Sequence, residues 1–435
     1  MMGHTPSRSL HPLTLLTLVI LTSLGCDLAE PAPSRRVLLI GIDGASPRVI
    51  ESLFAKDSLP NLARIRDGGV SGPIESLMPL LSPRIWNAIA TGKRPKKHGI
   101  ASFAHVDDHG IQRLYLGSDR KVHALWNMIS DAGMSVSVIN WWNTFPPEVI
   151  NGVMVSDHFQ RTEVAKREEL TSAVETPTGA VVFPESWEHR LVELSEIDEP
   201  PIVFADPYAE NQQLPHHGFI NWRLSNYFQE DGSVLRSALE VEEAEQPDVM
   251  LVFFPGIDRI SHFLWGMLEP PELYEERLRP SPTEREVGLR ALERYYEYTD
   301  ALIGALLERY GPNDLVIVLS DHGFEAKNGP SVLTGGHDSK AARFGAFFAR
   351  GAGISAGTAA GEINVLDITP TILTWLGLPV GEDMDGDVAE FVGGEPVARI
   401  ATHDTSPIER LQSTPSGSDE KMLENLRALG YLEEE

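Results

Sequence analysis

The feature that most constrains the fold is a set of three short, almost entirely apolar runs, each followed within four residues by an aspartate. The runs are "VLLIGI", "VMLVFF" and "LVIVLS", which begin at residues 37, 249 and 315. Such runs are typical of strands buried on both faces. Helical patterns such as "LPNLARIRDGG" (59–69) and "PTEREVGLRALERYYEYTDALIGALLERYG" (282–311) lie between them. This alternation predicts an α/β fold with a central, largely parallel sheet flanked by helices.

The length of the chain allows one large domain with an insertion, or two domains. It has 435 residues, of which 42% are hydrophobic, enough for a sizeable core. Periodicity is lost over residues 143–245, so we expect an inserted cap between two parts of the core, 36–142 and 246–400. In the remaining tail, 401–435, the run "SDEKMLENLRALGYLEEE" predicts a short amphipathic helix.

The N-terminus resembles a secretory signal. Residues 1–26 contain one charged residue, Arg8, and the apolar run "PLTLLTLVILTSLGC" ends at Cys26. That run suits a signal-peptide core and is too short to span a bilayer. Cys26 is the only cysteine, so no disulfide can form within the chain. "TSLGC" resembles a bacterial lipobox, which predicts a lipid on Cys26, a tether over 27–35 and a location on the outer side of a bacterial membrane. Plain secretion, with Cys26 in a discarded leader, is the alternative.

The charge balance argues against binding to duplex nucleic acid. The chain has 36 basic and 63 acidic residues, a formal net charge of −27. Neutralising a phosphate backbone requires clustered cations. Any anionic substrate must therefore be attracted locally.

Acids and histidines follow all three apolar runs. Asp43 follows the first, Asp258 and His262 the second, and Asp321 with His322 the third. In an open parallel sheet, ligands gather at the carboxyl ends of the strands. If helical, Asp258 and His262 share one face and can bind one ion. The alternative is that the acids only cap the next element.

Two further histidine motifs have simpler interpretations. "VSDHFQ" repeats the Asp-His pair at Asp157 and His158, but no glycine follows it, and "HVDDH" lies in a polar turn at 105–109. We interpret Asp157 and His158 as loop or cap residues. His337, in "TGGHDSK", could complete the set, but by itself we interpret it as a solvated loop residue.

Ser82 has two interpretations. In "LLSPRIWNAIATG" it precedes Pro83, which predicts a helix start with Ser82 as the N-cap. The same geometry would favour an ionised hydroxyl and a phosphoryl group, because a helix N-terminus stabilises anions. Position alone does not choose between a cap and a nucleophile.

Taken in order, the motifs "IGIDGASP", "LLSPRIWNAIATGKRPKKHGI", "PGIDRISH", "LSDHGF", "GGH" and "LDITPTILTWLGLP" resemble the alkaline phosphatase superfamily, in its bacterial type I phosphodiesterase/nucleotide pyrophosphatase branch. The resemblance covers roughly residues 36–103 and 245–390. It implies two divalent metal ions, most often zinc, at the carboxyl edge of the sheet. One ion would bind Asp43, Asp321, His322 and Ser82, and the other would bind Asp258, His262 and His337.

The resemblance further implies that Ser82 attacks phosphorus and forms a phospho-serine that water releases. The expected substrate is a small-molecule or lipid-linked phosphate ester. We expect Lys93, Arg94, Lys96 and Lys97 to add positive charge near the site. Phe103 stands where the family usually has an asparagine, which favours an apolar ester arm over a nucleotide. A phosphomonoesterase, a membrane phosphoryl-group transferase and a non-catalytic binding lipoprotein are the alternatives.

Overall fold

The structure is a computed structural model. It describes residues 1–3, 35–107, 109–159, 178–195, 197, 201–204, 217–329, 332–393, 397–414, 423 and 426. The chain divides into two compact units, residues 1–34 and residues 35–435, and all elements named below belong to the second. The expected signal peptide, Cys26 and nearly all of the tether lie outside the described residues. Within the described part, we find no helix that is both long and apolar enough to cross a membrane.

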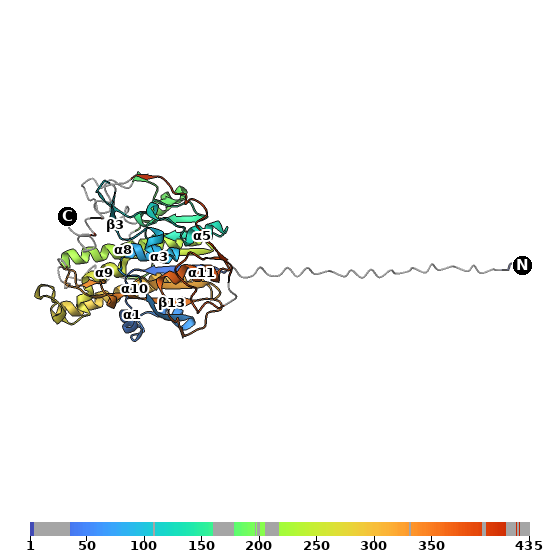
Figure 1. Cartoon of the computed structure of the whole chain (residues 1–435). Helices are drawn as coiled ribbons and strands as arrows, with labels where there is room; N and C mark the ends of the chain where they lie inside the picture. Colours follow the sequence, from blue (N-terminus) through green and yellow to red (C-terminus); the bar gives the residue numbers. More distant parts are fainter. Residues whose placement is uncertain are drawn as a thin grey trace. The chain divides into compact units, whose positions relative to one another are not determined.

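A nine-stranded mixed sheet forms the centre of this unit (Figure 1). Its strand order is β14-β2-β13-β10-β1-β9-β5-β6-β8. The five strands from β10 to β6 are all parallel to their neighbours, while β13 and β8 flank them in antiparallel orientation. The bounds are β1 Val37–Ile42, β2 Val70–Glu75, β5 Val136–Ile139, β6 Gly152–Val155, β8 Val182–Phe183, β9 Val249–Phe254, β10 Leu315–Ser320, β13 Phe344–Arg350 and β14 Thr358–Ala359. The predicted fold class is confirmed.

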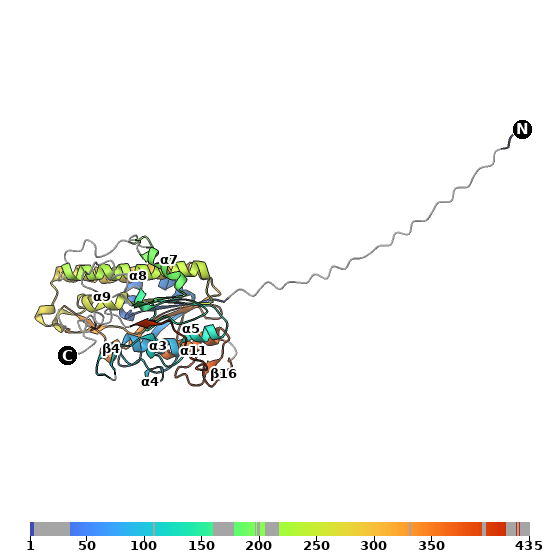
Figure 2. The same cartoon turned by 90° about the horizontal axis from the view of Figure 1, so that it is seen from above.

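Helices cover both faces of the sheet, as Figure 2 shows for α8 and α9 on one side and α3, α5 and α11 on the other. Successive side chains of a strand point to opposite faces. Accordingly, Leu38 and Ile40 of β1 belong to one hydrophobic cluster and Val37 and Leu39 to the other. The first cluster includes α1 (Pro47–Phe54), α2 (Pro60–Gly68), α8 (His217–Glu245), α9 (Gly256–Leu264) and α10 (Pro282–Leu307), and the second includes α3 (Ser82–Thr91), α5 (Leu125–Asp131) and α11 (Ile368–Trp375).

Part of the region expected to form a cap belongs to the body of the fold. Within 143–245, β6 and β8 are strands of the central sheet, and α8 packs against α9 and α10. Here the structure corrects the predicted cap. Two strands of four and two residues are too short for a sequence pattern to reveal.

Within 418–435, the run predicted to form a short helix, two residues are described, and both are helical. Leu423 and Leu426 are buried in a small cluster with Phe103 and Leu114. The tail therefore packs back on the body at these two positions. The other residues of the predicted tail helix lie outside the described part.

Candidate active site

Three buried aspartates lie at the carboxyl ends of adjacent parallel strands. Asp43 directly follows β1, Asp321 directly follows β10, and Asp258 lies in the first turn of α9, which follows β9. Ile42 of β1 is in register with Ser320 of β10 and with the last residue of β9, so the three strands end at the same level. Parallel register thus brings the three carboxylates together.

The first of two candidate metal groups contains Asp43, Asp321 and His322. The Nε2 atom of His322 lies 3.4 Å from Asp43 Oδ1 and 3.5 Å from Asp321 Oδ2. Its Nδ1 atom lies 2.9 Å from the carbonyl oxygen of Gly323. Because a carbonyl only accepts hydrogen bonds, Nδ1 is the protonated nitrogen, and Nε2 presents a lone pair to the carboxylates.

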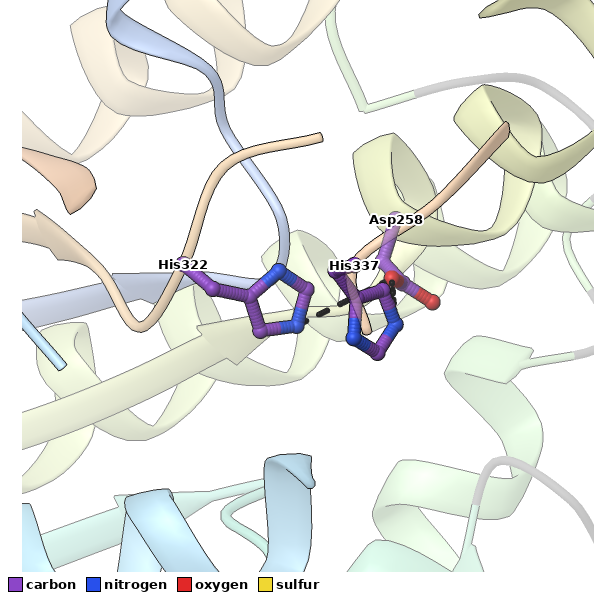
Figure 3. A group of neighbouring side chains, drawn as sticks. All are labelled: Asp258, His322 and His337. Carbon is purple, nitrogen blue, oxygen red and sulfur yellow. Dashed lines mark ion pairs between the residues drawn. The ribbon is translucent and has the colours of Figure 1, made fainter. Parts of the chain in front are cut away.

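The second candidate group contains Asp258, His322 and His337 (Figure 3). Oδ1 of Asp258 lies 3.5 Å from His337 Nε2 and 4.0 Å from His322 Nε2. The rings of His322 and His337 stack with centroids 3.9 Å apart. His262 Nε2 is also 3.5 Å from Asp258 Oδ1, and His262 Nδ1 faces the carbonyl oxygen of Gly335 at 3.0 Å. His322 belongs to both groups, a sharing that the sequence did not indicate.

Ser82 lies beside the first group. Its hydroxyl donates to Asp43 Oδ1 at 3.2 Å, and the side chain is buried. Ser82 is the first residue of α3, whereas Leu81 occupies the N-cap position. The prediction that Ser82 is the N-cap is therefore wrong, because the helix begins one residue earlier than expected. The short segment before Pro83 directs the hydroxyl toward Asp43 instead.

Burial and neighbouring charges shift the pKa values of the three carboxylates in the cluster. Burial, with the charges of Asp321 and Asp258 added, holds the pKa of Asp43 well above its ordinary value. Burial also raises the pKa of Asp321 to about 8. Asp258 differs, because its three neighbouring imidazoles outweigh burial and lower its pKa. Burying several carboxylates side by side is costly unless cations neutralise them.

The side chains of the cluster fit divalent metal ions. Asp321 Oδ2 and His322 Nε2 are buried atoms with no hydrogen-bond partner among the described residues. Mixed carboxylate and imidazole ligands suit zinc, and also manganese or iron. The backbone carbonyls behind His262 and His322 are the orienting partners that metal-binding histidines usually have.

The expected lysines and arginine near the site lie elsewhere. Lys93 follows the far end of α3, and a ten-residue helix is about 15 Å long. Its ammonium is buried and pairs with Asp383 and Asp404, each at 2.7 Å. Lys97 pairs with Asp385 at 2.6 Å. These acids neutralise Lys93 and Lys97 away from the carboxylate cluster, so the predicted contribution to the site is wrong for both lysines.

The second Asp-His pair has a structural role. Asp157 follows β6, is buried, and accepts hydrogen bonds from the backbone N–H groups of Asn143, Thr144 and Phe145 at 3.3, 3.2 and 3.1 Å. His158 stacks on the ring of Phe145. Neither residue belongs to a candidate metal group within the part of the chain that the structure describes.

Aromatic side chains border the cluster. Trp142 donates its indole N–H to Asp43 Oδ2 at 3.4 Å, and its ring lies 5.7 Å from that of Phe103. Of the other tryptophans, Trp141 and Trp187 belong to the hydrophobic core, and Trp222 is 48% exposed.

The parallel sheet, its helical layers and two adjoining Asp/His groups beside a serine define an α/β protein with a candidate two-ion site. The chain belongs to the type I phosphodiesterase/nucleotide pyrophosphatase family, whose model matches residues 37–334. The resemblance inferred from the motifs is confirmed.

Two sulfatase structures have similar folds, and a hydrolase structure matches with a lower score. A 2-O GAG sulfatase is 14% identical, with a TM-score of 0.54, and the match covers 83% of this chain and 76% of that one. A putative sulfatase from Bacteroides thetaiotaomicron is 13% identical, with a TM-score of 0.52, covering 82% and 73%. Phosphonoacetate hydrolase from Sinorhizobium meliloti is 15% identical, with a TM-score of 0.43. The latter match covers 69% of this chain and 59% of the hydrolase. No curated protein matches the sequence.

Proposed function

We propose that this protein hydrolyses phosphate esters, with a preference for diesters, and that Ser82 is the nucleophile. The observation that most supports this proposal is the 3.2 Å hydrogen bond from the Ser82 hydroxyl to Asp43, a member of the first Asp/His group. Membership of a phosphodiesterase and pyrophosphatase family supports the same reaction.

Two divalent ions are proposed as cofactors, with zinc as the proposed metal. Asp43, Asp321 and His322, with Ser82, would hold one ion. Asp258, His262 and His337 would hold the other, and His322 lies between the two groups. When bound, such ions stabilise negative charge on the attacking and leaving oxygens of an in-line displacement.

The chain's own residues would position the reaction. Asp43 accepts the hydrogen bond that orients the Ser82 oxygen, and the rigid start of α3 fixes that oxygen at the edge of the sheet. The oxygen would attack phosphorus, forming a phospho-serine ester as the bond to the leaving alcohol breaks and the alcohol takes up a proton. Water would then attack phosphorus and release Ser82 and the product phosphate.

The surroundings of the site favour an ester with an apolar second arm. Phe103 and Trp142 border the site, where they pack with the apolar side chains of Leu114 and Leu426. A diester needs such a surface, because its second ester group must lie outside the metal groups. A lipid-linked or small apolar phosphodiester is therefore the proposed substrate class.

The substrate class can be tested with two chromogenic esters on one preparation. We expect kcat/KM for bis-(4-nitrophenyl) phosphate to exceed that for 4-nitrophenyl phosphate. Ser82→Ala protein serves as the control for contaminating phosphatases. A clear preference for the monoester would contradict the diesterase proposal and leave ester hydrolysis intact.

The location of the enzyme is a separate proposal. The lipobox-like "TSLGC" supports lipidation of Cys26 and attachment to the outer side of a bacterial membrane. The intact mass of the native protein tests this. A chain that starts at Cys26 with added lipid supports it, and an unmodified chain that starts after residue 26 contradicts it.

A further inference from the structure

A second polar cavity lies outside the carboxylate cluster. Its volume is about 670 Å³, and none of the seven candidate site residues lines it. It is lined by the segment from Glu75 to Met78, which leads from β2 toward α3, and by residues 94–96 at the start of α4 (Pro95–His98). Arg84, on the first turn of α3, also lines it.

The cavity is positively charged, which is unusual in a chain with a formal net charge of −27. Three cationic side chains line it: Arg84, Arg94 and Lys96. Among the described residues, no carboxylate forms an ion pair with any of the three. The only acid in the lining is Glu75, which pairs with Arg343 at 3.2 Å. Asp385 lies beside Arg94, whose backbone N–H donates to it at 2.8 Å, but Asp385 forms its side-chain ion pair with Lys97. The three cationic side chains thus have no ion-pair partner among the described residues.

Two buried polar atoms supply a second, independent sign of a ligand. Ser76 Oγ and Arg84 Nε are both buried, and neither has a hydrogen-bond partner in the described part of the chain. Both residues line this cavity. Buried donors without partners are costly, and an anion accepting from both would remove that cost. The terminal nitrogen Nη2 of Arg84 donates to Met78 O at 2.9 Å, which fixes the guanidinium against the wall.

Arg84 and Arg94 also influence one another. Burial lowers the pKa of Arg84, and the charge of Arg94 lowers it further. Each guanidinium presents N–H donors in a planar fork that binds phosphate-type oxyanions, and Arg84 and Arg94 line the same cavity. Arg94 and Lys96 are exposed, so they can close over an anion that Arg84 and Ser76 bind from within.

We propose that this cavity is a binding site for a phosphate group distinct from the one that is hydrolysed. Arg84 lies two residues after Ser82, roughly 200° further around the helix axis. The first turn of α3 would therefore contact the scissile phosphate on one side and the second phosphate on the other. That phosphate belongs either to a soluble compound or to a phospholipid head group. The site does not depend on the proposed hydrolysis.

Inorganic phosphate is the probe, and titration calorimetry is the measurement. Because phosphate would also bind at metal ions in the catalytic cluster, the titration is made with His322→Ala protein, since His322 belongs to both candidate metal groups. We expect binding to persist in this variant and to weaken about tenfold when Arg94→Gln and Lys96→Gln are added, since two charge-assisted contacts are lost. Adding Lys56→Gln and Arg64→Gln, the same charge change outside the cavity, should leave the affinity unchanged. Both altered pairs are exposed, so the fold should tolerate them.

Two results would overturn the proposal: no phosphate binding by the His322→Ala protein at millimolar phosphate, or equal weakening by the two pairs of substitutions. Arg84→Lys, which keeps the charge but removes the fork, should weaken binding without affecting Tm.

A vesicle assay then identifies the source of the phosphate. Vesicles of phosphatidylglycerol should retain the wild-type protein more than vesicles of phosphatidylcholine if the ligand is a head group, and Arg94→Gln/Lys96→Gln should abolish the difference. Equal retention by the two vesicles, with phosphate binding intact, assigns the site to a soluble phosphate compound.

Discussion

The hydroxyl of Ser82 donates a hydrogen bond to Asp43 Oδ1 at 3.2 Å, although the two residues are 39 positions apart in the chain. The bond joins the start of α3 to the end of β1. It places a hydroxyl oxygen beside three buried aspartates and three histidines, the arrangement on which the proposed chemistry depends.

The position of Ser82 leads to a sharp prediction. The N-cap position is occupied by Leu81, not by Ser82. Loss of a capping side chain costs about 1 kcal/mol of stability, and Ser82→Ala should cost less, so Tm should fall only slightly. Turnover should fall at least a hundredfold, about 2.7 kcal/mol in activation free energy. Ser82→Thr keeps a hydroxyl and should retain part of the activity. Parallel measurements of Tm and kcat test this prediction. An Ala variant that is active but destabilised would contradict the nucleophile assignment and show that Ser82 has a structural role.

The second Asp-His pair provides a matched control for the metal site. Asp157→Ala removes the acceptor of three buried backbone N–H groups, so unfolding free energy should fall by about 1–3 kcal/mol. Metal content should stay at the wild-type level. Chemical denaturation and elemental analysis of the same preparation measure both quantities. Loss of metal from a folded Asp157→Ala protein would show that the site extends to β6.

Removal of the ions should make stability depend on pH. The folded-state pKa of Asp321 is raised from 3.8 to about 8. Between these values the ion-free folded state binds more protons than the unfolded state, so its stability falls as pH rises through this window. Below pH 6.5 the depressed pKa of His337 opposes this trend.

The stabilities of the zinc-loaded and ion-free proteins should therefore be compared between pH 6.5 and 8. Asp231, whose pKa burial also raises to about 8, contributes equally with and without ions. Bound cations keep Asp321 ionised, so the Tm difference between zinc-loaded and ion-free protein should widen from pH 6.5 to pH 8. A difference that stays constant or narrows would contradict the assignment of Asp321 as a ligand.

The sequence predicted the sheet and the positions of its acids because both depend on local pattern. Apolar runs such as Leu315–Ser320 can only be buried, and parallel strands end at a common edge, which is where Asp43, Asp258 and Asp321 lie. His337, on a neighbouring loop, was assigned to the site only through the motif resemblance.

Other features depend on contacts that no local pattern encodes. The neutralisation of Lys93 requires Asp383 and Asp404, about three hundred positions away, to return to the end of α3. His322 belongs to both candidate metal groups because its Nε2 atom lies within 4.0 Å of carboxylate oxygens of both, a proximity that residue spacing cannot show. The charged cavity likewise forms only when β2, α3 and α4 are packed together.

The central claim is that a shared Asp/His cluster holds two metal ions, and the metal content of His322→Ala protein tests it most directly. His322 Nε2 lies within 4.0 Å of carboxylate oxygens in both candidate groups. Wild-type protein should contain about two divalent ions per chain. Folded His322→Ala protein should lose both ions and at least a hundredfold in ester hydrolysis, about 2.7 kcal/mol. Full metal content in this variant would contradict the account.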